Sequence, residues 1–137
     1  MSCNFCDIAS GKLAAEIVFR GEKAVAFLDH RPLFPGHVLL IPDKHFDTLA
    51  DLPGDYVAPL FEAAQRLQIA VEKAMQAEGS FVAINNKVSQ SVPHVHVHIV
   101  PRRKGDGLKG FFWPRRPYES EEHLRETGER IRQALGT

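Results

Sequence analysis

The sequence predicts an α+β fold in which one long helix packs on an antiparallel five-stranded sheet and a second helix ends the chain. Two observations support this. Five short runs rich in β-branched and aromatic residues are bounded by Gly and Pro, whereas one long segment repeats its apolar residues every three and four positions. The order of these runs, three strands, a long helix and two strands, is typical of an antiparallel sheet with helices on one face.

The first three strands are predicted before residue 43. Residues 16–19 and 24–28 are strand-like and are separated by Arg20-Gly21-Glu22-Lys23, which indicates a hairpin. Residues 31–36 form a Pro/Gly loop, and residues 37–41 are a third strand that Pro42 stops. His37 therefore begins a strand beside Gly36.

The long helix is expected after the Asp-Leu-Pro-Gly-Asp sequence of residues 51–55, which supplies capping chemistry. The apolar stripe of this helix extends over about five turns at the 3.6-residue period and ends before Gly79. Its members are Val57, Leu60, Phe61, Ala64, Leu67, Val71 and Met75.

The last two strands are predicted at residues 80–85 and 94–100, with a polar loop between them. In the second of these, three histidines alternate with apolar residues, so Val95, Val97 and Ile99 can enter a core while the histidines form a row on the other face. A strand rises ~3.3 Å per residue, which separates His94 from His98 by roughly 13 Å. The row therefore favours an extended ligand, such as a phosphate chain, over a metal site that uses all three histidines.

The C-terminal part differs in composition. Residues 101–117 form a basic and aromatic loop, for which three alternatives stand: a rim that favours anionic ligands, a solvated loop packed on the core or a second subunit, or a surface for single-stranded nucleic acid. Residues 119–136 are expected to form an amphipathic helix. Its apolar face holds Leu124, Thr127, Ile131 and Leu135.

Length and charge restrict the classes of function. At 137 residues the chain is expected to form a single domain, residues 1–137. Seventeen Lys and Arg balance seventeen Asp and Glu, so no net field attracts nucleic acid or an anionic membrane. No apolar run approaches a membrane span, and the N-terminus does not resemble a signal peptide. We expect a cytoplasmic protein with a small-molecule partner.

Cys3 and Cys6 form a C-x2-C pair. In a chain with no sign of export this pair is a metal half-site, a redox pair or two ordinary thiols, and a disulfide framework is not expected. Two further ligands elsewhere in the chain would favour the metal site.

Residues 94–100, His-Val-His-Val-His-Ile-Val, resemble the signature of the histidine-triad (HIT) superfamily of nucleotide hydrolases and transferases, in which histidines alternate with apolar residues. All seven positions fit. The likeness extends to the Gly-His and Ile-Pro pairs of residues 29–42 and to Gln90-Ser91-Val92, and the C-x2-C pattern is similar to the bacterial Hint-like branch.

The resemblance implies an enzyme whose nucleophile is the middle histidine, His96. It would attack the α-phosphate of a purine nucleoside monophosphate that carries a substituent, giving a nucleotidyl-histidine that water or another acceptor resolves. His98 would contact a non-bridging oxygen of that phosphate, and Ser91 would donate to the leaving atom. His94 is the remaining catalytic member of the triad, and it cannot serve freely in a proton relay if it also ligates a metal ion.

The resemblance also implies a nucleoside pocket and a metal site. The base and ribose pocket would comprise Phe5, Ile8, Leu13, Phe27, Leu28 and Asp29, with further substrate contacts from His37, Asn85 and Gln90. The Asp29 carboxylate would bind the sugar hydroxyls. Cys3, Cys6, His45 and His94 would hold a structural zinc ion, and no organic cofactor is implied.

The implied partner is an adenine or guanine nucleotide, and the family's usual assembly is a homodimer. Two other functions compete with hydrolysis or transfer on a nucleoside monophosphate. One is a non-catalytic nucleotide-binding sensor, and the other is a dinucleoside polyphosphate hydrolase or phosphorylase. A metal-dependent hydrolase that uses the histidine row is a third alternative, which the strand spacing disfavours.

Overall fold

The computed structural model describes residues 2–108 and 115–136. These residues divide into two units, one that ends at Asp106 and one that begins at Gly107. Lys109, Phe111, Phe112 and Trp113, part of the predicted basic and aromatic loop, lie outside the described residues. Among the helices in the described ranges, none has the length and apolar character needed to cross a membrane.

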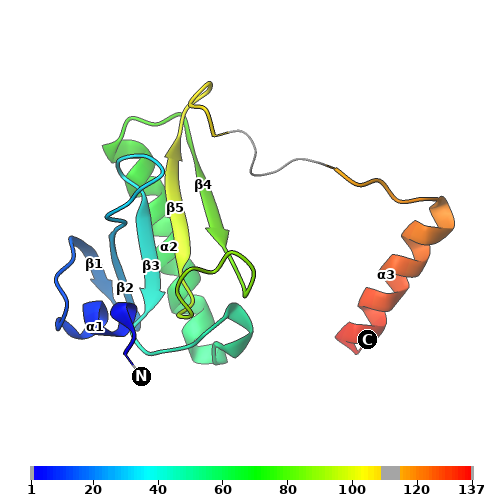
Figure 1. Cartoon of the computed structure of the whole chain (residues 1–137), viewed down its shortest axis with the longest axis horizontal. Coiled ribbons are helices and arrows are strands. Elements are labelled where there is room, and N and C mark those ends of the chain that lie inside the picture. The colour runs from blue at the N-terminus through cyan, green and yellow to red at the C-terminus, as the bar shows by residue number, and fades with distance from the viewer. Residues whose placement is uncertain (1, 109–114, 137) are drawn as a thin grey trace. The chain divides into compact units, whose positions relative to one another are not determined.

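Five strands in the first unit's described residues form one antiparallel sheet in the order β1-β2-β3-β5-β4 (Figure 1). Their bounds are β1 Ile17–Gly21, β2 Ala24–Leu28, β3 Val38–Pro42, β4 Gly79–Ile84 and β5 Val97–Arg102. The predicted hairpin is confirmed by the pairing of β1 with β2. Because β3 and β5 are neighbours, the register places Leu39 opposite His98 and brings the start of the third strand to the histidine row.

Helix α2, Gly54–Ala74, packs on one face of the sheet and lies behind the strands in Figure 1. Its buried residues are Tyr56, Leu60, Ala63, Ala64, Leu67 and Val71. The predicted stripe was wrong at Val57 and Phe61, which are 39% and 45% exposed, because the packed arc of the helix is centred on Leu60 and Ala64 instead.

The predicted cap of α2 was also wrong. Pro53 is the N-cap residue of α2 and makes no side-chain capping bond. The Asp51 carboxylate instead accepts hydrogen bonds from the backbone N–H and the hydroxyl of Thr48 and closes a capping box on the short helix η1, Leu49–Asp51.

Helix α1, Asn4–Ser10, packs on the face of the sheet opposite to α2. The expectation that the helices pack on one face was therefore wrong for α1. Phe5 and Ile8 contact Val25, Phe27, Leu39 and Ile41, which alternate along β2 and β3 with the residues under α2. Cys3 is the N-cap residue, and Gly11 at φ 85° ends the helix in the left-handed region that favours glycine. The helix thus brings both cysteines to the face that carries the histidines.

The second unit contains helix α3, Glu121–Leu135, close to the predicted range 119–136. Ser120 caps its N-terminus by accepting a hydrogen bond from the His123 backbone N–H, and Gly136 ends it. Its apolar residues Leu124, Ile131 and Leu135 are exposed.

Candidate active site and metal-binding group

The histidine segment divides its side chains between the two faces of the sheet, as the alternation predicts. Val95, Val97 and Ile99 are fully buried in the core under α2. His96 and His98 lie on the other face with their ring centroids 4.8 Å apart. Strand β5 begins only at Val97, three residues later than predicted. The His94 carbonyl accepts from His96 Nδ1 and the Val95 N–H donates to the Phe46 carbonyl, which lies outside the strands, so neither group pairs with β3 or β4.

A pocket of about 1000 Å³ opens on this face. The predicted residues Phe5, Ile8, Leu13, Phe27, Leu28 and Asp29 line it together with Ser91, His96 and His98. The structure therefore brings apolar walls, one carboxylate, a hydroxyl and two imidazoles into one space, a composition suited to a small amphipathic ligand.

The sequence reasoning missed other residues of this lining. His30 and Arg31 line the pocket beside Asp29, as do Asn4, the first residue of α1, and Glu16, which directly precedes β1. His30 and Arg31 directly follow a predicted pocket carboxylate, a signal that could have identified them. The Arg31 backbone N–H donates to Asp29 Oδ1 at 2.9 Å and so orients that carboxylate.

Four of the predicted catalytic and substrate-binding residues lie outside the lining that the described residues form: His37, His94, Asn85 and Gln90. His37 and His94 nevertheless contact the lining histidines. Asn85 directly follows β4. Gln90 makes hydrogen bonds to the backbone on both sides of its amide.

His96 has its protonation pattern set by the backbone. Its Nδ1 lies 2.8 Å from the His94 carbonyl oxygen, which can only accept, so Nδ1 carries the proton. In the neutral ring, Nε2 is then left with a free lone pair. His96 is 3% exposed, and Phe5 packs against it edge-on with ring centroids 5.2 Å apart.

His98 is oriented by a relay through His37. The Leu33 backbone N–H donates to His37 Nδ1 at 3.1 Å, so His37 carries its proton on Nε2 and donates it to His98 Nδ1 at 3.0 Å. His98 Nε2 then carries a proton available to a ligand. Burial, followed by the repulsion from His96 and His37, lowers the pKa of His98 to about 4, so the ring is neutral at pH 7.

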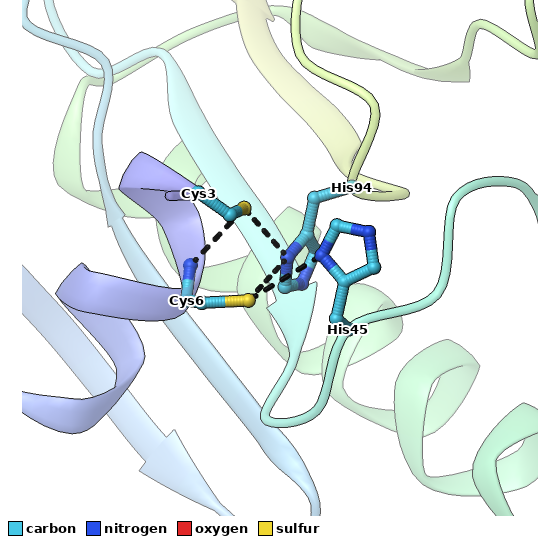
Figure 2. A group of neighbouring side chains, drawn as sticks. All are labelled: Cys3, Cys6, His45 and His94. Carbon is cyan, nitrogen blue, oxygen red and sulfur yellow. Dashed lines mark hydrogen bonds between the residues drawn. The ribbon is translucent and has the colours of Figure 1, made fainter. Parts of the chain in front are cut away.

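Cys3, Cys6, His45 and His94 form a second group beside the pocket, with one ligand atom of each residue within 4.8 Å of all the others (Figure 2). His94 Nδ1 lies 3.5 Å from both sulfur atoms, and His45 Nδ1 lies 3.4 Å from Cys6 Sγ. The ligand atoms around a tetrahedral zinc ion are separated by roughly 3.3–3.8 Å, given Zn–S and Zn–N distances of ~2.3 and ~2.0 Å. These four residues could hold a metal ion.

The outer nitrogens of the two histidines are held in the way that metal ligands require. His94 Nε2 donates to the Pro42 carbonyl at 3.2 Å and His45 Nε2 to Asp47 Oδ1 at 2.7 Å, which leaves both Nδ1 atoms free to bind. Burial lowers the pKa of His94 to about 4, so its ring is neutral. Asp47, two residues after His45, was not identified from the sequence.

The pKa values of the two thiols are shifted in opposite directions. Burial favours the neutral form of Cys3, but hydrogen bonds outweigh it, beginning with that from the Cys6 backbone N–H at 3.4 Å, and lower the pKa of Cys3. Burial and then the neighbouring Cys3 raise the pKa of Cys6 to about 11. A bound cation would favour deprotonation of both thiols.

A family model described as the HIT domain matches residues 10–105. The chain belongs to the HIT family. This confirms the histidine-triad resemblance, and the matched range contains all five strands and α2.

Several relatives of this HIT protein are known by sequence. It is 35% identical over 136 residues to an uncharacterized HIT-like protein of Saccharolobus solfataricus, covering 97% of this chain and 94% of that one. An adenosine 5′-monophosphoramidase of Candida albicans is 31% identical, and the match covers 82% of this chain and 78% of that one. A bis(5′-nucleosyl)-tetraphosphatase of Schizosaccharomyces pombe is 38% identical, and the match covers 69% of this chain and 53% of that one.

Solved structures agree with the fold and support the α+β prediction. A HIT family member from Bacillus subtilis matches with a TM-score of 0.88 at 29% identity, covering 97% of this chain and 96% of that one. A zinc-bound histidine triad family protein from Mycobacterium smegmatis matches with a TM-score of 0.74 at 38% identity, with 98% of each chain covered.

Proposed function

We propose that this HIT protein is a nucleotide hydrolase or nucleotidyltransferase that cleaves a substituent from the α-phosphate of a purine nucleoside monophosphate through a nucleotidyl-histidine intermediate. One observation carries the proposal. His96 Nδ1 lies 2.8 Å from the His94 carbonyl oxygen and donates its proton there, so the Nε2 lone pair is free in a pocket that also contains a hydroxyl and a second imidazole. Such an imidazole can attack phosphorus without first losing a proton.

In the first step, His96 Nε2 forms a bond to the α-phosphorus and the bond from phosphorus to the substituent breaks. The substituent leaves with the bonding electron pair and takes a proton from the Ser91 hydroxyl. His98 Nε2–H donates to a non-bridging oxygen and stabilises the charge that develops there. The neutral state of His98 keeps this donor in its relay with His37.

In the second step, water or another acceptor attacks the same phosphorus and the bond to His96 Nε2 breaks. The acceptor's proton returns to Ser91, and the nucleoside monophosphate or its transfer product departs. The His94 carbonyl stabilises the positive charge on His96 while the adduct exists, because Nδ1–H stays bonded to it.

The nucleoside half of the substrate binds against the apolar walls of the pocket, of which Phe5 also contacts His96. Phe5, Ile8 and Phe27 pack on the purine, and Asp29 accepts hydrogen bonds from the ribose hydroxyls. The hydrogen bond from the Arg31 N–H keeps the Asp29 carboxylate in one orientation. Leu13 and Leu28 are partly exposed at the pocket edge and cover the nucleoside.

The metal in this proposal is a zinc ion held by Cys3, Cys6, His45 and His94. Zinc in such a closed four-ligand set contributes folding free energy and leaves no position for a reacting water. His94 then stabilises the segment that carries His96, and it takes no part in proton transfer. The zinc-bound relative from Mycobacterium smegmatis supports this assignment.

We also propose a homodimer. The exposed apolar residues Val57 and Phe61 on α2, and Leu124, Ile131 and Leu135 on α3, offer surface for association. Sedimentation at micromolar concentration would contradict the dimer if it found only a 15.3 kDa species.

A second candidate function is dinucleoside polyphosphate cleavage, which the similarity to the Schizosaccharomyces pombe tetraphosphatase favours. A product screen separates the two. Purified protein is incubated with adenosine and guanosine phosphoramidates, an acyl adenylate, adenosine phosphosulfate and a dinucleoside tetraphosphate, with and without phosphate as acceptor. We expect the fastest release of a nucleoside monophosphate from a phosphoramidate. Turnover of the tetraphosphate alone would favour the second function, and binding without turnover would favour the sensor.

A further inference from the structure

Two loops meet beside the pocket, and Gln90 joins them. The metal loop, residues 43–48, carries His45, and the Ser91 loop, residues 85–93, carries Ser91. Gln90 Nε2 donates to the Asp47 carbonyl oxygen of the metal loop at 2.5 Å. Gln90 Oε1 accepts from the Lys87 N–H of its own loop at 2.8 Å. Both ends of the amide are therefore used by the backbone.

Asp47 extends this connection to the metal-binding group. Its carboxylate accepts from His45 Nε2 at 2.7 Å while its carbonyl accepts from Gln90. A second link, from the Leu49 N–H to Asn86 Oδ1 at 2.9 Å, joins the segment after the metal loop to the start of the Ser91 loop. Gln90 lies at the other end of that loop, next to Ser91.

The Ser91 loop has a backbone that needs such support. Lys87 and Ser89 have φ angles of 70° and 60°, in the left-handed region that residues other than glycine seldom adopt. Strained conformations of this kind persist where surrounding contacts hold them. The hydrogen bond from the Lys87 N–H to Gln90 spans both of these residues.

We propose that Gln90 is a positioning residue that fixes Ser91 for proton donation to the leaving group by bonding its loop to Asp47. This inference rests on the proposed function and deepens it. It assigns Gln90 an effect through Ser91 in place of direct contact with substrate. It also connects the metal loop to the leaving-group side of the pocket, because Asp47 supports both His45 and Gln90.

The test uses Gln90→Glu, which keeps the oxygen that accepts from Lys87 and removes the N–H that donates to Asp47. Two substrates share adenosine monophosphate and differ in the departing group. An alkylamine phosphoramidate needs a proton on its leaving nitrogen, whereas a p-nitrophenyl ester departs as a stable phenolate. We expect Gln90→Glu to lower kcat for the phosphoramidate by ~10- to 100-fold with little change in KM, since small misplacements of catalytic groups cost that much. The rate with the p-nitrophenyl ester should change less than threefold.

Two comparisons keep the result specific. Ser91→Ala should show the same preference for the p-nitrophenyl ester, and adding Gln90→Glu to Ser91→Ala should cause no further loss, because the two residues act as one unit. Ser89→Asp adds the same charge one position away, at a backbone conformation that Asp tolerates, and should behave like the unmodified protein. Zinc content and melting temperature, measured on each variant, should stay near those of the unmodified protein.

Several outcomes would overturn the inference. Equal losses on both substrates, a rise in KM alone, or losses in Gln90→Glu and Ser91→Ala that multiply would show that Gln90 acts by another route. A similar loss in Ser89→Asp would assign the effect to charge. If Ser91→Ala does not discriminate between the substrates, the role of Ser91 in the proposed function fails as well. If Ser91→Ala discriminates and Gln90→Glu does not, only the inference fails.

Discussion

Replacing His37 tests whether the relay to His98 matters for the reaction. His37 is 3% exposed, accepts from the Leu33 N–H and donates to His98 Nδ1, and lies outside the pocket lining that the described residues form. His37→Leu removes both bonds. A buried polar group left without a partner costs about 1–3 kcal/mol, which corresponds to a factor of roughly 5 to 150 in rate if His98 loses its orientation in the transition state.

His37→Gln is the matched control for this change. The terminal amide nitrogen of Gln can take the place of His37 Nε2 and keep a donor to His98 Nδ1. We expect His37→Leu to lower kcat for adenosine 5′-phosphoramidate by ~5- to 150-fold with KM nearly unchanged, and His37→Gln to retain most of the rate. Steady-state kinetics with parallel melting curves provide the measurement. Equal rates in the two variants, or an effect on KM alone, would refute the relay.

Three further predictions follow from the same geometry. The unmodified protein should contain about one zinc ion per chain, and Cys3→Ser should contain less and melt at a lower temperature, since structural zinc contributes folding free energy. Elemental analysis that finds no zinc in unmodified protein prepared without chelator would contradict the assignment. Asp29→Asn should raise KM for nucleotides ~10-fold or more with a smaller effect on kcat, because a hydrogen bond to a charged group contributes about 1.5–3 kcal/mol. Unchanged affinity for the product monophosphate, measured by calorimetry, would contradict this role. The pKa of His98 is lowered to about 4 in the folded chain, so between about pH 4 and 6.5 the unfolded chain binds a proton that the folded chain does not. The free energy of unfolding should therefore fall as pH drops through that window. Urea unfolding of His98→Asn should show a dependence of this free energy on pH that is shallower by up to ~1.4 kcal/mol per pH unit.

The alternation in residues 94–100 was enough to predict both faces of the central segment. The apolar positions Val95, Val97 and Ile99 lie in the core, and the histidines lie on the other face. The point at which the strand begins could not be read from this pattern, because the His94 carbonyl bonds to a side chain instead of a neighbouring strand. Local side-chain bonds of this kind compete with the sheet without changing the period.

Contacts between distant segments were harder to predict. His37 and His98 are 61 residues apart, and only the pairing of β3 with β5 brings them together. The buried arc of α2 likewise depends on where the sheet lies, so Tyr56 and Ala63 replaced Val57 and Phe61. The four metal-group residues were foreseen from the family resemblance, whereas Asp47 and the bonds of Gln90 required the structure.

A rapid-quench experiment on His96 tests the central claim most directly. Unmodified protein is mixed with radiolabelled adenosine 5′-phosphoramidate, quenched in base and analysed for label bound to protein, with His96→Ala and His98→Ala treated in parallel. We expect an acid-labile, base-stable adduct in the unmodified protein, none in His96→Ala, and slow formation in His98→Ala, because removing one donor to the developing charge costs ~10²–10³ in rate but leaves the nucleophile. An adduct in His96→Ala, or none in any of the three proteins while product still forms, would contradict the account.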